Sequence, residues 1–179
     1  MAYLLPAARS GNVLAQSMVG SAYAALSDFD NAKQWLIRAT ESGISFGNMA
    51  LSSLYMYGIG VPKNPAKAMD LLSKAVDEGH CTAQFMLGKM YYDGDEDVAI
   101  KKDYKKAYMY LTLAKLCGIY GNEDKETQKM IDKIEGKGLL WDSDPLIPHA
   151  ELQAAKQEAE RRFEKIKDRT AEKSGWWFW

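Results

Sequence analysis

Three residues draw attention first, because their side chains can bind a metal or form a covalent bond. They are His80, Cys81 and Cys117. Their spacing matches no zinc pattern, because a zinc site needs four grouped ligands. We therefore predict no metal. A disulfide is the other chemistry open to the pair, because Cys81 begins one predicted helix and Cys117 ends the next, at the same end of an antiparallel hairpin. Free buried thiols are the commoner outcome for so few cysteines.

Other residue types give no catalytic constellation. The acidic segment 93–97 resembles a calcium loop only faintly, because Tyr104 stands where the twelfth position requires Glu. No nucleophile has a base at a recognisable spacing. Gly58-Ile59-Gly60 is not followed by a phosphate-binding pattern, and His149 is predicted to be a surface residue. We predict neither a cofactor nor an enzyme activity.

Composition narrows the class of protein further. The chain has 179 residues, 47% of them apolar and 26% charged, with a formal net charge of -1. This balance is typical of a folded globular protein. It lacks the basic excess of a nucleic-acid-binding protein, and no apolar run approaches the roughly 18 residues of a membrane span.

The chain contains an internal repeat, which must determine where all these side chains lie. One pattern begins at Ala15, Gly47 and Ala83, so that the steps are 32 and 36 residues. Its three copies are Ala15, Val19, Gly20 and Tyr23; Gly47, Leu51, Ser52 and Tyr55; and Ala83, Leu87, Gly88 and Tyr91. A second pattern follows each copy, as Ala32, Ala39 and Gly43; Ala68, Ala75 and Gly79; and Ala107, Ala114 and Gly118.

The spacing within the patterns predicts helical hairpins. Offsets of four and three place each apolar set on one helical face. Gly20 and Gly88 allow a neighbouring helix to approach closely, and Gly43, Gly79 and Gly118 stand where each second helix should end in a left-handed cap. A single hairpin cannot bury both of its faces, so the units must stack.

The segment Leu51–Gly79 carries the clearest family signature and resembles the Sel-one-like repeat, a relative of the tetratricopeptide repeat. Ser52 departs from the family's glycine. The matching positions are Tyr55, Gly58, Gly60, Val61, Lys67, Ala68, Lys74, Ala75 and Gly79. The resemblance covers residues 1–118. It implies an all-α fold, a right-handed α-solenoid of stacked helix-turn-helix repeats that serves as a protein-binding scaffold.

These patterns also predict the domain organisation. Residues 1–11 match the end of a second helix, and complete repeats follow over 12–43, 44–79 and 80–118. The half-repeat suggests that upstream residues have been removed. The compartment stays open, and the periplasm is weakly favoured if those residues included a signal sequence.

The C-terminal third leaves the repeat register. Residues 119–148 are predicted to form a helix, Asn122 to Glu135, and a loop with Pro and Trp. Residues 149–179 are predicted to form an amphipathic helix with an aromatic tail. The apolar stripe of that helix is Leu152, Ala155, Ala159, Phe163 and Ile166. The rest of it is charged, so we expect it to cap the stack.

Stacks of this kind bind partners on a concave face lined by first helices. On each first helix, the repeated apolar positions form a stripe that faces the core, and a second stripe runs next to it. In the second and third repeats this second stripe carries large side chains: Phe46, Met49, Met56, Phe85, Lys89 and Tyr92. Aromatic residues and methionine suit a binding surface, because they offer area and adapt in shape. These side chains either bind a partner, complete the core or pack under the terminal helices.

The aromatic tail is a second candidate. It includes Trp176, Trp177 and Trp179. This segment either folds back over the last helix, makes a weak contact with a membrane surface, or docks on a partner.

The resemblance implies a bacterial protein–protein interaction module. Its most specific form is an immunity or adaptor protein that binds a toxic effector or secreted enzyme. The alternative is a structural scaffold associated with the cell envelope. The fold alone does not name the partner.

Overall fold

The computed structural model describes residues 3–41, 45–119, 121–137 and 145–174. Within these residues it contains nine helices and, as its only β structure, an isolated bridge between Asp95 and Ile100. The predicted all-α fold of helical hairpins is confirmed. The chain divides into two compact units, Met1–His80 and Cys81–Trp179. No helix in the described ranges is long and apolar enough to cross a membrane.

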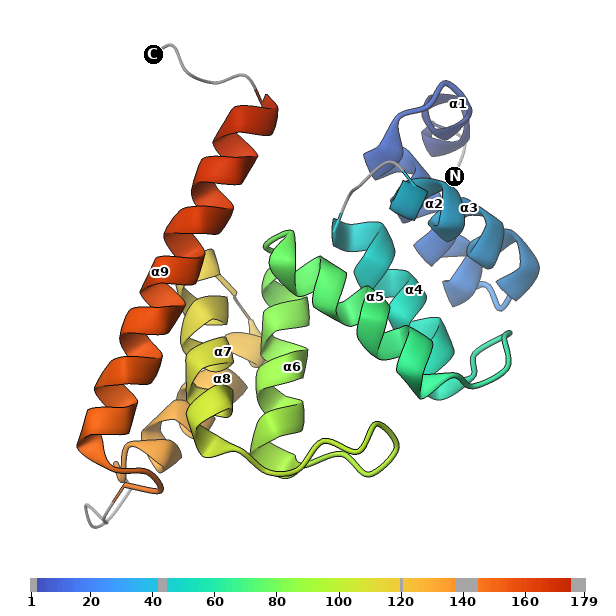
Figure 1. Ribbon diagram of the computed structural model, residues 1–179. Coiled ribbons are helices and arrows are strands. Elements are labelled where there is room, and N and C mark those ends of the chain that lie inside the picture. Colours follow the sequence, from blue (N-terminus) through green and yellow to red (C-terminus); the bar gives the residue numbers. More distant parts are fainter. Residues whose placement is uncertain (1–2, 42–44, 120, 138–144, 175–179) are drawn as a thin grey trace. The chain divides into compact units, whose positions relative to one another are not determined.

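The first unit consists of two hairpins and a short leading helix (Figure 1). Its helices are α1 (Leu4–Arg9), α2 (Val13–Ala25), α3 (Phe29–Glu41), α4 (Ser45–Tyr57) and α5 (Pro65–Asp77). Helix α2 pairs with α3, and α4 pairs with α5. Helix α1 packs on α2, while α4 packs on α3 and also contacts α2. The apolar side chains at these contacts include Val19, Trp35, Leu36, Leu51, Leu54 and Leu71.

A small residue brings the two helices of the first hairpin together. A Cβ atom at Gly20 would lie 2.7 Å from Cγ of Leu36, closer than such atoms approach in proteins. On the facing helix, Ala32 and Ala39 are fully buried. The sequence-based expectation of a close approach at the small positions is therefore confirmed.

Side-chain caps set where several helices begin. The Asn64 side chain accepts a hydrogen bond from the Lys67 backbone N–H at 3.0 Å, and Pro65 occupies the first helical position of α5. Asp103 caps α7 in the same way, accepting from the Lys106 N–H at 2.9 Å. These side chains satisfy backbone donors that a helix N-terminus leaves unpaired.

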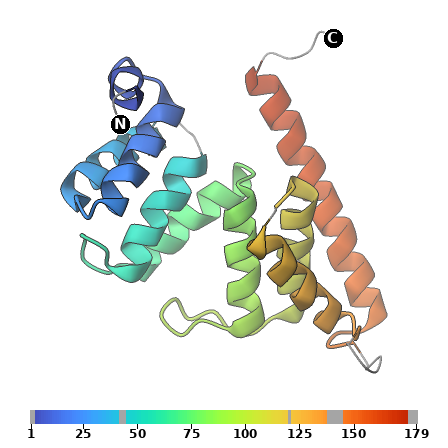
Figure 2. The ribbon, with the colours of Figure 1, turned by 180° about the vertical axis from the view of Figure 1, so that it is seen from behind.

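The second unit is built around one hairpin, α6 (Cys81–Asp93) and α7 (Tyr104–Cys117). Helix α8 (Asn122–Ile134) packs on α7 and also contacts α6, and α9 (His149–Ser174) packs along α7. Seen from behind in Figure 2, α8 crosses in front of the hairpin and α9 runs along its edge. These helices share one core, whose largest fully buried side chains are Leu111, Leu113 and Ile134.

A glycine cap and a disulfide lie at the same end of this hairpin. Gly118 follows the last residue of α7 and caps the helix with a φ of 94°, the predicted left-handed conformation. Cys81 and Cys117 form a disulfide at the same end, with their Cα atoms 5.5 Å apart. Of the two sequence-based outcomes for these thiols, the structure therefore contains the disulfide.

The long C-terminal helix packs as the amphipathic pattern predicts. Leu152, Ala155 and Ala159 are buried in the core of the second unit, and Phe163 and Ile166 are half-buried against it. Up to Arg169, its other side chains are mostly exposed and charged. Helix α9 therefore covers the apolar side of α7 that would otherwise face water.

Candidate functional site

Helix α2 presents an uncharged face to solvent. The segment Val13–Ala25 contains no Asp, Glu, Lys or Arg. Its buried side carries Val19 and Gly20. On the opposite side Leu14 is 55% exposed and Met18, one turn later, is 43% exposed. A helix on the surface of a globular protein usually turns charged residues to water, so this apolar face is unusual and accessible.

Helix α4 is also free of charged residues. Phe46 and Met49 are half-buried on it, and the Phe46 ring lies 5.6 Å from the ring of His80. Burial lowers the pKa of His80, so the neutral imidazole is favoured there. Met56 is only 7% exposed. The expectation that Met56 faces solvent is therefore wrong, and two of the three α4 residues of the predicted surface remain partly accessible.

The corresponding stripe of α6 is covered by α8. Phe85 is 6% exposed and belongs to the core of the second unit. Lys89 forms an ion pair with Glu126 of α8 at 2.5 Å, and this contact raises the pKa of Lys89. Tyr92 is half-buried with its ring edge-on to Tyr104.

The expectation that Phe85 faces solvent is therefore corrected, and the alternative, packing under a terminal helix, describes its position. Replacing this side chain with Ala would test stability rather than binding, because truncating a buried Phe costs about 3–5 kcal/mol. The contact between α6 and α8 has a signal in the sequence, a pair of glutamates at the start of α8. Glu123 and Glu126 lie one turn apart at the start of α8, opposite Thr82 and Lys89.

The aromatic residues Trp176, Trp177 and Trp179 lie outside the described residues. In the part of the chain that the structure describes, no three His, Cys, Asp or Glu side chains are grouped closely enough to hold a metal ion.

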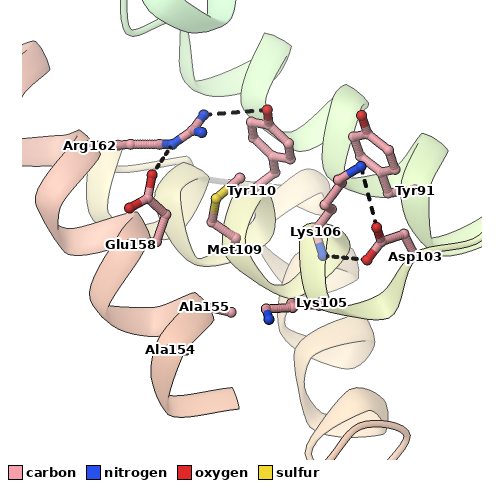
Figure 3. Close-up of a pocket in the computed structure, with 10 residues that line it drawn as sticks. All are labelled: Tyr91, Asp103, Lys105, Lys106, Met109, Tyr110, Ala154, Ala155, Glu158 and Arg162. Carbon is pink, nitrogen blue, oxygen red and sulfur yellow. Dashed lines mark hydrogen bonds and ion pairs between the residues drawn. The ribbon is translucent and has the colours of Figure 1, made fainter. Parts of the chain in front are cut away.

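A pocket of about 420 Å³ lies in the second unit, between α7, α9 and the end of α6 (Figure 3). This volume is within the range of small-ligand sites. The lining residues are Tyr91, Asp103, Lys105, Lys106, Met109, Tyr110, Ala154, Ala155, Glu158 and Arg162. Met109 and Ala155 are buried and form an apolar part of the wall. The sequence patterns did not indicate this site.

Two tyrosines and two cations line one side of the pocket. The rings of Tyr91 and Tyr110 are parallel, with centroids 5.8 Å apart. The Lys106 ammonium lies 5.0 Å from the centre of the Tyr91 ring, and the Arg162 guanidinium lies 5.6 Å from that of Tyr110. Such cation–π contacts hold long side chains in place, so both cations are oriented at the pocket.

Comparisons with known proteins agree with the observed hairpins. The family model of the Sel1 repeat matches residues 13–44, 45–80 and 82–119, which together make up more than half of the chain. No curated protein matches the sequence.

The solved structures that are similar to the chain include the following two. One is a protective antigen present in uropathogenic Escherichia coli strains, which displays an SLR fold. It is 23% identical with a TM-score of 0.71, and the match covers 92% of this chain and 32% of that one. The chain thus spans about a third of that protein's length. The other is a Sel1 repeat protein from Oxalobacter formigenes, 28% identical with a TM-score of 0.56, covering 70% of this chain and 95% of that one.

Proposed function

Because the chain belongs to the Sel1 repeat family, we propose that it is a protein–protein interaction module whose partner binds the first helices of the first unit. Repeats of this family generally mediate protein–protein interaction. The observation that carries the proposal is the exposed, uncharged face of α2, with Leu14 and Met18 accessible. Exposed apolar patches on globular proteins commonly mark interaction sites.

Residues of α4 extend the proposed contact within the first unit. Phe46 and Met49 are half-buried on α4, next to α2 in the same unit. We propose Lys89 and Tyr92, which are half-buried on α6 of the second unit, as a separate contact. We also include Trp176, Trp177 and Trp179, because tryptophan is enriched among the residues that dominate binding energy at interfaces.

The more specific form of the proposal is a bacterial immunity or adaptor protein. Such a protein binds a toxic effector or secreted enzyme and holds it inactive. The solved structures that resemble the chain include proteins of two bacteria, which is the ground for proposing a bacterial role. The alternative is an envelope-associated scaffold, which the aromatic tail favours because Trp side chains suit a membrane–water interface.

Co-expression with the products of the flanking genes tests the proposal. We expect one of these products to co-purify with the chain at a ratio of one to one, measured by size-exclusion chromatography with light scattering. If that partner is a phospholipase or nuclease, its activity should fall as the complex forms.

Two outcomes would count against the immunity version. A flanking cell-wall or exopolysaccharide gene cluster whose product binds the chain would favour the scaffold. The absence of any complex at micromolar concentrations would contradict a partner encoded nearby.

A further inference from the structure

We propose that the pocket between α7 and α9 binds an acidic peptide segment of a partner protein, with an apolar side chain on Met109 and Ala155 and a carboxylate at Arg162 and Lys106. This inference rests on the proposed protein-binding function and adds a second, chemically distinct contact. It concerns the second unit, whereas the surface proposed above centres on the first.

The charge balance of the pocket favours an anionic ligand. Its lining holds three cations, Lys105, Lys106 and Arg162, against two carboxylates, Asp103 and Glu158. The lining is therefore net +1, in a chain whose formal net charge is -1. An acidic segment would be attracted to this part of the molecule.

The carboxylates of the pocket are already occupied. Glu158 accepts hydrogen bonds from Arg162 Nε at 2.8 Å and from Arg161 Nη2 at 2.6 Å. The hydrogen bond from Arg162, together with that from Arg161, lowers the pKa of Glu158. Asp103 accepts from the backbone N–H of Lys106 at the start of α7. Both acids are thus engaged by the protein itself and offer little to a cationic ligand.

The cations, by contrast, keep donors available. Arg162 donates Nε to Glu158 and Nη1 to the Tyr110 hydroxyl at 3.4 Å, which are two of its five N–H donors. The Nζ of Lys106 lies 3.5 Å from Asp103, and that of Lys105 lies 3.6 Å from Glu151. These are long, solvent-exposed ion pairs of small net strength. A ligand carboxylate can therefore accept from Arg162 and Lys106 without displacing a strong contact.

The apolar wall supplies the second half of the recognition. Met109 and Ala155 both line the pocket, and Met109 lies next to the Tyr110 ring (Figure 3). The flexible thioether of Met adapts to side chains of different shape. A free anion such as phosphate would leave this wall uncovered, whereas an apolar side chain next to an acidic residue would use both parts of the site.

Fluorescein-labelled peptides test the proposal on the full chain. The probe is Gly-Asp-Phe-Glu-Leu-Asp-Gly. One comparison peptide replaces its acids with Lys, and another replaces Phe and Leu with Ser. We expect saturable binding of the probe with a Kd below about 1 mM, weaker binding of both comparison peptides, and a shifted methyl resonance of Met109 in labelled protein.

Two neighbouring arginines provide a matched pair of variants. Both Arg161 and Arg162 donate to Glu158, but only Arg162 lines the pocket. Arg162→Gln should raise the Kd of the probe about ten-fold, because it removes a charge-assisted hydrogen bond. Arg161→Gln should leave the Kd unchanged. The two variants should show the same circular dichroism and thermal unfolding.

The proposal would be overturned by equal Kd values for the two variants, or by no saturable binding of the probe. Arg162-dependent binding to phosphatidylglycerol vesicles without peptide binding would overturn it in favour of a membrane. Substitutions at Leu14 and Met18 should leave peptide binding intact. If the peptide fails to bind but the partner protein still does, only this inference fails and the proposed function stands.

Discussion

At the scale of single residues, the disulfide between Cys81 and Cys117 joins the two ends of the central hairpin of the second unit. It bridges residues 36 apart in the sequence. By the chain-entropy model a loop of this length is worth about 4 kcal/mol of folding free energy. Reduction, or the double substitution Cys81→Ala and Cys117→Ala, should lower the free energy of unfolding by up to that amount.

Thermal unfolding with and without dithiothreitol measures this effect. The reductant should lower the Tm of the native chain and leave that of the double variant unchanged. An intact mass that does not rise by two hydrogens on reduction would mean that the thiols are free, and the prediction would fail.

Residue patterns predict positions on a helix better than they predict exposure. The repeat offsets place Phe85 and Lys89 on one stripe of the first helix of the third repeat. In the structure both residues lie on this helix, α6. The offsets do not reveal what covers that stripe. Glu126 of α8 pairs with Lys89, and Phe85 packs into the core that α8 shares. Exposure depends on a helix outside the repeat register, so the repeat pattern could not supply it.

At the scale of elements, small residues set the distance between paired helices. A Cβ atom at Gly88 would lie 2.9 Å from Cγ of Leu111 and 3.1 Å from its backbone nitrogen. Overpacking usually costs about 1–3 kcal/mol, and Ala gains roughly 1 kcal/mol over Gly in a helix. We therefore expect Gly88→Ala to lower the free energy of unfolding by up to about 2 kcal/mol.

Urea denaturation provides the measurement, with Ser52→Ala as the matched control. Ser52 holds the equivalent position in α4 and already carries a Cβ atom, so its substitution removes only a hydrogen bond to the Met49 carbonyl. We expect the control to change stability little. An increase in stability for Gly88→Ala would show that helix propensity outweighs the close approach.

Elements with a regular pattern are also those that the sequence predicts well. The hairpins follow from the repeat, and α9 follows from the stripe of Leu152, Ala155 and Ala159. The pocket does not follow from either pattern. It forms where α9 lies along α7, so that Arg162 meets Tyr110 across 52 residues of sequence. Only the packing of the two helices places these side chains together.

At the scale of the whole molecule, two units offer different chemistry to a partner. The first presents the uncharged face of α2, which suits an apolar surface. The second presents a net cationic pocket between α7 and α9. Each contact can be tested by substitutions confined to one unit.

The central claim is that the chain binds a protein through the first helices of its first unit. Isothermal titration of the co-purified partner into the native chain, a Leu14→Gln and Met18→Gln double variant, and a Leu116→Gln control tests it most directly. Leu116 is 39% exposed on α7, which belongs to the second unit. We predict that the Kd rises at least about ten-fold for the double variant, because each buried apolar side chain at an interface contributes about 1 kcal/mol or more, and that it is unchanged for the control. The same Kd for all three proteins would contradict the claim.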